Sequence, residues 1–211
     1  MAQSSGMSDV LLPSMSIDRV LYPVTSLGPG RRVAIWTIGC DKGCARCANP
    51  ELWYDDLSKR VEIGAFVQTI CDTIGGQPIE GVTITGGEPL RQIEALARLL
   101  PLLREISGDI LIYTGYTFSE AEAKLPGLAW EKVKALTSVF IDGEYIDRLN
   151  DNLSPLIGST NQTIRIMDQS LRGKYETYLA RGRLVQNVYH GDRMISVGIH
   201  NTDRGQGHAI G

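Results

Sequence analysis

Three cysteines that lie close together in the sequence are the residues best suited to chemistry. Cys40, Cys44 and Cys47 have the spacing C-x3-C-x2-C. Three thiolates can hold three corners of an iron–sulfur cube, whereas a cluster held by protein alone usually takes four. One iron would then be open, and an open coordination position is where a metal site does chemistry. The spacing therefore predicts an iron–sulfur site with one reactive corner.

The same thiols allow a second interpretation, a structural zinc site. Zinc sites usually pair a C-x2-C unit with a second pair of ligands downstream. The histidines of this chain are His190, His200 and His208, all far away near the carboxyl terminus. The spacing therefore favours iron over zinc. A zinc module or a simple electron carrier stays open as a non-enzymatic alternative.

Charge and hydropathy indicate the surroundings of these thiols. The net charge is −3 and the basic residues do not cluster, so we expect no nucleic-acid partner. The chain starts without a secretory signal and contains no apolar run of about 18 residues, so we expect a cytoplasmic protein with no membrane partner. Clustered thiols stay reduced there. The fourth cysteine, Cys71, follows the apolar spacing of a helix over residues 62–74, and we expect it in the core.

A second motif with chemical potential is Gly86-Gly87-Glu88-Pro89, which follows a β-rich run. A glycine has no Cβ, so two of them allow the backbone to approach a ligand closely. The backbone would then offer carbonyl and amide groups to that ligand. Taken alone, the motif is about as typical of a tight turn.

The elements that must position both motifs alternate along the chain. Such alternation predicts an α/β fold with a mainly parallel sheet and functional loops at the carboxyl ends of its strands. Both motifs follow strands, so we expect them at the same edge of the sheet. The predicted strands cover residues 33–38, 81–85, 109–114 and 138–142, and the predicted helices cover 62–74, 92–106 and 119–136, the last broken near 126–127.

A length of 211 residues favours one domain with a small addition. We expect a flexible leader over residues 1–16, a core domain over 17–168 and a C-terminal extension over 169–211. The extension should contain a polar helix, a β-hairpin turning at Gly191-Asp192 and a mobile tail, because two β-like runs flank that dipeptide.

Taken together, the motifs resemble the radical S-adenosylmethionine (SAM) superfamily, in which C-x3-C-x2-C binds a [4Fe–4S] cluster and a GGEP-type segment binds the amino group of SAM. Five segments resemble the activating proteins of glycyl radical enzymes more closely. The resemblance runs from about Tyr22 to Asp168 and implies a partial (βα)6-type radical SAM barrel. The five segments are Gly28–Arg31, Cys47–Trp53, Tyr113–Thr117, Ile141–Gly143 and Gly158–Gln162.

The resemblance also implies a reaction and its participants. Cys40, Cys44 and Cys47 would hold three irons, and SAM would chelate the fourth. A one-electron donor such as flavodoxin or ferredoxin would reduce the cluster, and SAM would break to methionine and a 5′-deoxyadenosyl radical. That radical would take a hydrogen atom from a glycine of an anaerobic ribonucleotide reductase or similar partner. The implied SAM-binding residues are Arg46, Cys47, Ala48, Gly86, Gly87, Glu88, Tyr113, Thr114 and Tyr116.

Two departures from the family pattern keep alternatives open. Many members have Pro-Gly between the second and third cysteines and an aromatic residue after the third, where this chain has Ala45-Arg46 and Ala48. Arg46 could pair with the SAM carboxylate, stack on its adenine or point to solvent. The extension over residues 169–211 is the other departure. It allows a second hypothesis, in which the substrate is a peptide or a small molecule and the extension shapes its site.

Overall fold

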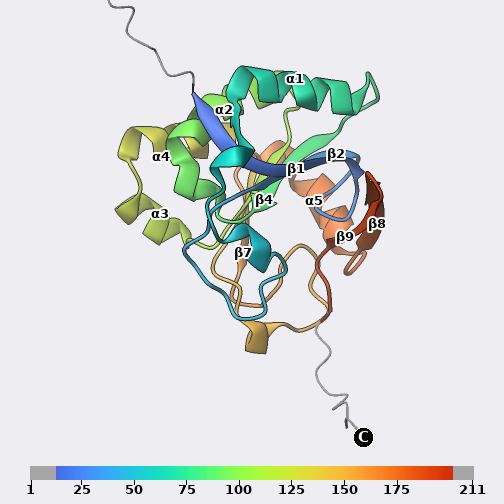
Figure 1. Cartoon of the computed structure of the whole chain (residues 1–211). Coiled ribbons are helices and arrows are strands. Elements are labelled where there is room, and N and C mark those ends of the chain that lie inside the picture. The colour runs from blue at the N-terminus through green and yellow to red at the C-terminus, as the bar shows by residue number, and fades with distance from the viewer. Residues whose placement is uncertain (1–12, 202–211) are drawn as a thin grey trace, which may run out of the picture.

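The computed structural model describes residues 13–201, which form a seven-stranded sheet with helices on both faces (Figure 1). The strand order is β3-β1-β2-β4-β5-β6-β7, and a separate two-stranded hairpin lies beside the sheet. The sheet contains β1 (Ser14–Val24), β2 (Arg32–Thr37), β3 (Arg60–Glu62), β4 (Gly81–Gly86), β5 (Ile110–Thr114), β6 (Val139–Asp142) and β7 (Thr163–Ile166), and the hairpin contains β8 (Val185–His190) and β9 (Arg193–Gly198).

The four central strands, β2, β4, β5 and β6, run parallel. Thr37 pairs with Gly86, and Thr114 pairs with Asp142, so the carboxyl ends of these strands meet at one edge of the sheet. Antiparallel pairings flank this centre: β1 pairs with β2 and then β3 pairs with β1 on one side, and β7 pairs with β6 on the other. The prediction of an α/β fold with a parallel central sheet is confirmed.

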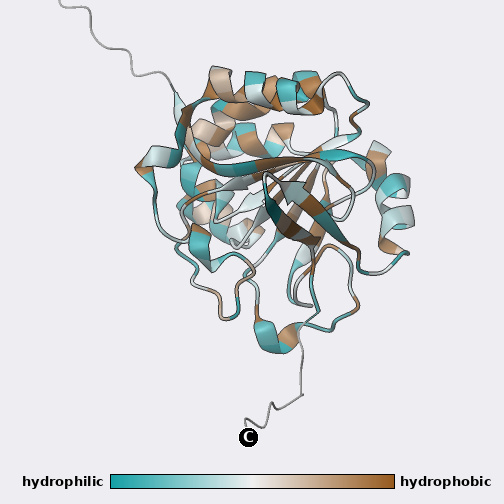
Figure 2. Cartoon of the chain, turned by 45° about the vertical axis from the view of Figure 1, so that its right-hand side comes forward, coloured by the Kyte–Doolittle hydropathy of each residue, from teal (hydrophilic) through white to brown (hydrophobic). Residues whose placement is uncertain are grey.

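Five α-helices surround the sheet, and the alternation of side chains along the strands decides what each face meets. Val33 and Ile35 of β2 face a core formed with α1, α2 and α4. Ala34 and Trp36 face the opposite side and the β8–β9 hairpin. In Figure 2 hydrophobic residues gather in the central strands and in the helix surfaces against them. The helices are α1 (Ile63–Ile74), α2 (Ile93–Ile106), α3 (Phe118–Lys124), α4 (Gly127–Leu136) and α5 (Arg172–Leu179), with short 3-10 turns at Pro50–Leu52, Leu57–Lys59, Pro89–Gln92, Asp147–Leu149 and Gln169–Leu171.

A buried charge network closes the amino edge of the parallel strands. The guanidinium of Arg32 is fully buried, and its Nη1 lies 3.0 Å from Oδ2 of Asp109. Nε of Arg32 donates to Oγ1 of Thr83 at 2.7 Å. Lys174 and Tyr175, both in α5, donate to the same Asp109 carboxylate at 2.9 and 2.8 Å. The network therefore fastens the helix of the extension to the core strands.

Two expectations need correction. β1 begins at Ser14, so residues 14–16 belong to the sheet and the predicted leader is too long; residues 1–12, like 202–211 of the predicted tail, lie outside the described residues. The prediction that Cys71 is buried is wrong, because this side chain is exposed. The buried face of α1 is a narrow stripe, and Cys71 lies just beside it; the stripe contains Ile63, Phe66, Ile70 and Ile74.

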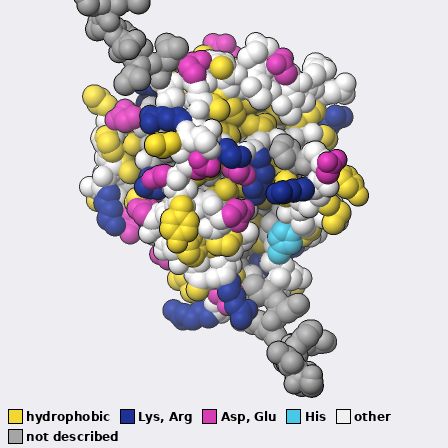
Figure 3. Space-filling view, in the orientation of Figure 1, with side chains coloured by type: hydrophobic (Ala, Val, Ile, Leu, Met, Phe, Trp, Pro, Cys, Tyr) yellow, Lys and Arg dark blue, Asp and Glu magenta, His cyan; other side chains and the backbone are white. Residues whose placement is uncertain are grey.

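The surface carries mixed charge. Basic and acidic side chains are interspersed over the face shown in Figure 3, without a large area of one sign. None of the helices within residues 13–201 is long and apolar enough to cross a bilayer.

Candidate active site

The cysteines lie in a loop that leaves the carboxyl end of β2 and returns beside its own start. The amide of Gly39 donates to the carbonyl of Leu52 at 2.9 Å, and the amide of Cys40 donates to that of Trp53 at 3.0 Å. These two bonds close the loop at its base. The loop therefore projects from the sheet edge where a parallel α/β fold places its functional groups.

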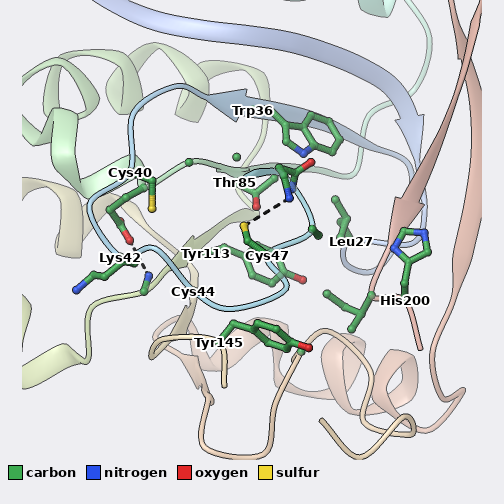
Figure 4. A pocket seen from close by; sticks show the side chains of 18 of the residues that line it. Leu27, Trp36, Cys40, Lys42, Cys44, Cys47, Thr85, Tyr113, Tyr145 and His200 are labelled. Atoms are coloured by element: carbon green, nitrogen blue, oxygen red, sulfur yellow. Dashed lines mark hydrogen bonds between the residues drawn. The ribbon is translucent and has the colours of Figure 1, made fainter. Parts of the chain in front are cut away.

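One cavity of about 470 Å³ brings the two sequence motifs together (Figure 4). Its size suits a single drug-sized ligand. Of the residues expected at the site, all line the cavity except Tyr116: Cys40, Cys44, Arg46, Cys47, Ala48, Gly86, Gly87, Glu88, Tyr113 and Thr114.

The three thiols are free and partly buried. Burial raises the pKa of Cys40, and burial together with the nearby Glu144 carboxylate raises the pKa of Cys44 to about 11. Sγ of Cys47 accepts a hydrogen bond from the amide of Asn49 at 3.4 Å. The thiolate form of Cys44 thus needs a cationic partner, and a metal that coordinates a thiol supplies that charge.

Within residues 13–201, no three His, Cys, Asp or Glu side chains are gathered closely enough to hold a single metal ion. The three thiols nevertheless share one cavity wall. A cluster takes one thiolate at each of several irons, so its ligands stand further apart than the ligands of one ion.

Gly86 and Gly87 are required for a reason that differs from the expected one. A Cβ on Gly86 would overlap the backbone of Thr37, and a Cβ on Gly87 would lie 2.5 Å from the carbonyl oxygen of Gly39. The amide of Gly87 donates to the Thr37 carbonyl, and that of Glu88 to the Gly39 carbonyl, both at 2.8 Å. The close approach joins the motif to the base of the cysteine loop. The two motifs are therefore parts of one packed unit.

Glu88 is the most buried ionisable group of the cavity, with an exposure of 1%. Its carboxylate accepts from the amides of Leu90 and Gly115 at 2.9 and 2.7 Å and from Oγ1 of Thr114 at 2.8 Å. Burial raises the pKa of Glu88 to about 7, although these bonds and Lys42 oppose the shift. Glu88 ties the end of β4 to the end of β5 and places a proton-binding group beside the cavity.

Tyr116 and Arg46 were both expected to bind SAM, and the structure gives each of them other contacts. Tyr116 does not line the cavity, because its ring packs under Nζ of Lys42, 3.6 Å from the ring centre, and its hydroxyl donates to Asp41 at 3.3 Å. Arg46 does line the cavity, but its side chain is 66% exposed and lies 3.8 Å from Asp147. Its φ of 56° is left-handed, a conformation that favours glycine.

Three side chains of the cavity wall have donors without a partner in the described part of the chain, and the sequence predicted only Tyr113 of them at the site. Nε of Arg19, Nε1 of Trp53 and the hydroxyl of Tyr113 are buried without a hydrogen-bond partner among the described residues. All three side chains line the cavity. Buried polar atoms are nearly always hydrogen-bonded, so these donors fit a polar group bound there. Trp53 and Tyr113 belong to segments that resemble the family, whereas Arg19 comes from β1, and no local sequence signal points to it.

Comparisons with known proteins identify the chain. A model of the family described as "4Fe-4S single cluster domain" matches residues 26–165. The anaerobic ribonucleoside-triphosphate reductase-activating protein of Escherichia coli (strain K12) is 30% identical over 155 residues, which cover 68% of this chain and 94% of that protein. The chain belongs to the radical SAM family of activating enzymes.

Two further proteins are similar to this radical SAM enzyme. The pyruvate formate-lyase-activating enzyme of Staphylococcus aureus (strain USA300) is 31% identical over 155 residues, covering 68% of this chain and 59% of that one. The crystal structure of QueE from Escherichia coli aligns with a TM-score of 0.43 and 19% identity over 75% of this chain and 67% of that chain.

The cofactors of this radical SAM enzyme are a [4Fe–4S] cluster and SAM, and the donor set fits both. Three thiols are available for three irons. Arg19, Trp53 and Tyr113, each with a buried donor that has no partner among the described residues, line the same cavity and suit a polar ligand. The family relationship supports an enzyme rather than a zinc module or a simple electron carrier.

Proposed function

We propose that this radical SAM enzyme makes a glycyl radical on a partner of the anaerobic ribonucleotide reductase type. When bound, the cluster and SAM together supply a 5′-deoxyadenosyl radical. The observation that supports the proposal best is the joining of the cysteine loop and the Gly-Gly-Glu segment around one cavity. The match over 94% of the reductase-activating protein supports this choice of partner.

The residues of the chain have separable tasks in this proposal. Cys40, Cys44 and Cys47 would hold the cluster, and the donors of Arg19 and Tyr113 would orient SAM beside it. Apolar walls such as Trp36, which is 4% exposed, keep water from the reacting centre. Exclusion of water protects a reactive intermediate from side reactions.

The test begins with cofactor content. Reconstitution without oxygen should give about four irons and four sulfides per chain. With dithionite, or with flavodoxin or ferredoxin as the donor, the protein should then form 5′-deoxyadenosine. Cys44→Ser should lose both properties. Cys71→Ser is the matched control, because Cys71 is exposed on α1 and should change neither.

The partner is tested by electron paramagnetic resonance. A glycyl radical signal should appear on an anaerobic ribonucleotide reductase encoded beside this protein when it is mixed with the reconstituted enzyme and SAM. A signal on a formate-lyase-type protein instead would change the partner, as the similarity to the second activating enzyme allows. SAM cleavage without a signal on either protein would contradict the proposal.

A second candidate has an observation of its own. Residues 196–201, which belong to the extension, line the cavity. The same radical chemistry could therefore act on another peptide or on a small molecule. A precursor peptide that is modified in step with 5′-deoxyadenosine formation would favour this candidate.

A further inference from the structure

The extension contributes a wall to the cofactor cavity. The family model ends at residue 165, so α5, β8 and β9 lie beyond the part of the chain that it matches. Residues 196–201, the end of β9 and the segment after it, line the cavity together with the cysteine loop. Figure 4 shows His200 on the side of the cavity away from Cys40. We name residues 196–201 the wall segment.

The hairpin that carries the wall segment is fastened to the end of β1. Gln186 accepts from the amide of Thr25 at 2.9 Å and donates to the carbonyl of Pro23 at 2.8 Å. The hydroxyl of Ser26 donates to the carbonyl of Val197 at 2.8 Å, and Val197 is 2% exposed. These contacts hold the first half of the wall segment against the core.

A single buried guanidinium fixes the second half. The Arg183 side chain is 6% exposed, although charged side chains are seldom buried unless they are paired. It bridges the loop over residues 151–157 and the end of the wall segment. Its acceptors are the carbonyl oxygens of Ser154 (3.0 Å), Ile157 (3.2 Å) and His200 (3.0 Å), with Oδ1 of Asp151 and Oδ1 of Asn201 each at 3.4 Å.

The chemistry of the wall segment indicates what it meets. Ser196 and His200 are exposed, and Oγ of Ser196 lies 2.8 Å from Nε2 of His200. The segment contains no Lys, Arg, Asp or Glu. The lysine and arginine side chains that line the cavity belong to the core domain and not to the extension; they are Arg19, Lys42 and Arg46. Hydroxyl, imidazole and amide groups suit a peptide backbone, whereas phosphate recognition relies on added positive charge.

We propose that the wall segment, positioned by Arg183, narrows the approach to the cofactors and admits an extended polypeptide segment. Arg183 is a positioning residue, and Ser196 and His200 contact the polypeptide. The class of substrate rests on the proposed function. The existence of a wall does not, because it depends on contacts within this chain, those of Gln186 and Ser26 for its first half and those of Arg183 for its second.

The wall is tested on the full-length, cluster-free protein carrying Cys71→Ser, so that only the three loop cysteines remain. Arg183→Met should speed their reaction with a bulky polyethylene-glycol maleimide at least about tenfold, because loss of several charge-assisted hydrogen bonds favours local opening. Reaction with small iodoacetamide should change less than about twofold, since a narrowed approach still admits it. Arg181→Met is the matched control, because Arg181 is exposed and lies outside the wall segment.

Circular dichroism and thermal melting show whether each variant is folded. If Arg183→Met does not fold, Arg183→Lys replaces it, since lysine keeps the charge but cannot bridge several carbonyls at once. If the loop cysteines react with the polyethylene-glycol maleimide at equal rates in the Arg183 and Arg181 variants, the proposal that the wall segment narrows the approach is wrong. A similar rise for both reagents would also overturn it, because that result means general loosening.

The polypeptide assignment is tested with His200→Ala in the reconstituted enzyme. The KM for the partner should rise, and the yield of glycyl radical per 5′-deoxyadenosine should fall about fivefold or more, as for loss of one or two hydrogen bonds to the substrate. Asn187→Ala, an exposed change on β8 outside the cavity, should leave this ratio unaltered. An unchanged KM and ratio in His200→Ala would contradict contact with the polypeptide. If no partner acquires a radical, the proposed function fails, while the thiol measurement still decides the wall.

Discussion

Two buried carboxylates lie at opposite ends of the parallel strands and differ in how they are compensated. Asp109 comes just before β5, at the amino edge, and Glu88 comes just after β4, at the carboxyl edge. Burial alone would raise the pKa of Asp109, but Arg32, Lys174 and Tyr175 hold it below the usual value. Glu88 has neutral donors as its hydrogen-bond partners, and burial raises its pKa to about 7.

The difference indicates that the amino edge of the parallel strands stabilises the fold, whereas the carboxyl edge is suited to chemistry. We call them the structural edge and the chemical edge. At the amino edge Asp109 is paired with Arg32 and Lys174, which lets α5 and the core strands share one network. At the carboxyl edge the compensation is incomplete: Glu88 has a raised pKa, and three donors in the same cavity have no partner. Incomplete compensation is costly in a folded protein and is typical of sites that bind or react.

The largest effect should come from breaking the paired edge. Asp109→Asn leaves the buried guanidinium of Arg32 without its counter-charge, so we expect the free energy of unfolding to fall by about 3–5 kcal/mol. Urea denaturation measures it. The control is Asp55→Asn, which breaks an exposed bidentate pair with Arg91. That change should cost less than about 1 kcal/mol. Equal losses in the two variants would show that the buried network is not a special source of stability.

The second prediction concerns the opposite edge and its pH dependence. The pKa of Glu88 in the folded protein, about 7, lies above the usual glutamate value of 4.5. Between these values the folded protein keeps a proton that the unfolded chain has lost, so stability falls as pH rises through this window. Relative to Glu88→Gln, the wild type should lose up to about 3 kcal/mol between about pH 4.5 and pH 7.

Denaturation curves of the two proteins across this range measure the difference. The test is how this difference in the free energy of unfolding changes with pH, not its absolute size, because glutamine also disturbs the hydrogen bonds from Leu90 and Gly115. The Asp109 edge should have the opposite sign: a lowered pKa contributes stability that is lost only in acid, as pH falls through that pKa. If the difference in the free energy of unfolding between the wild type and Glu88→Gln does not change with pH, burial does not hold the proton on Glu88.

The chemical edge could be predicted from sequence further than the structural one. The cysteines and Gly86-Gly87-Glu88 are local motifs, and strand–helix alternation placed both at one sheet edge. β1 was missed because its run contains Asp18, Arg19 and Pro23, and it becomes a strand through antiparallel pairing with β2 and β3.

Other features could not be predicted from the sequence because they depend on packing between distant parts of the chain. Arg19 and His200 reach the cavity from opposite ends of the chain, so no spacing could connect them with the cysteines. Cys71 satisfies helical periodicity, but the width of the covered face depends on what packs against α1. Tyr116, two residues after Thr114, turns toward Lys42 because the chain leaves β5 there.

A smaller effect tests how tightly the two motifs of the chemical edge are joined. Gly87→Ala places a Cβ 2.5 Å from the carbonyl oxygen of Gly39 and 3.0 Å from that of Leu52, and both are backbone atoms. We expect a loss of about 1–3 kcal/mol from overpacking, together with lower iron content, since the base of the cysteine loop must move. Gly108→Ala is the control, because its Cβ would meet no atom within 4 Å. Full iron content in a destabilised Gly87→Ala would show that the loop is independent of the Gly-Gly-Glu segment.

The smallest effect concerns backbone strain at the same edge. Arg46 has a φ of 56°, and its exposed side chain makes only a 3.8 Å ion pair with Asp147. Arg46→Ala keeps the left-handed cost, whereas Arg46→Gly removes it, so the glycine variant should be the more stable of the two by about 1 kcal/mol. Urea denaturation measures this difference, and equal stabilities would mean that the position is unstrained. SAM titration of the same pair separates the roles of Arg46: equal weakening in both variants assigns the guanidinium to SAM, and unchanged affinity leaves it in solvent.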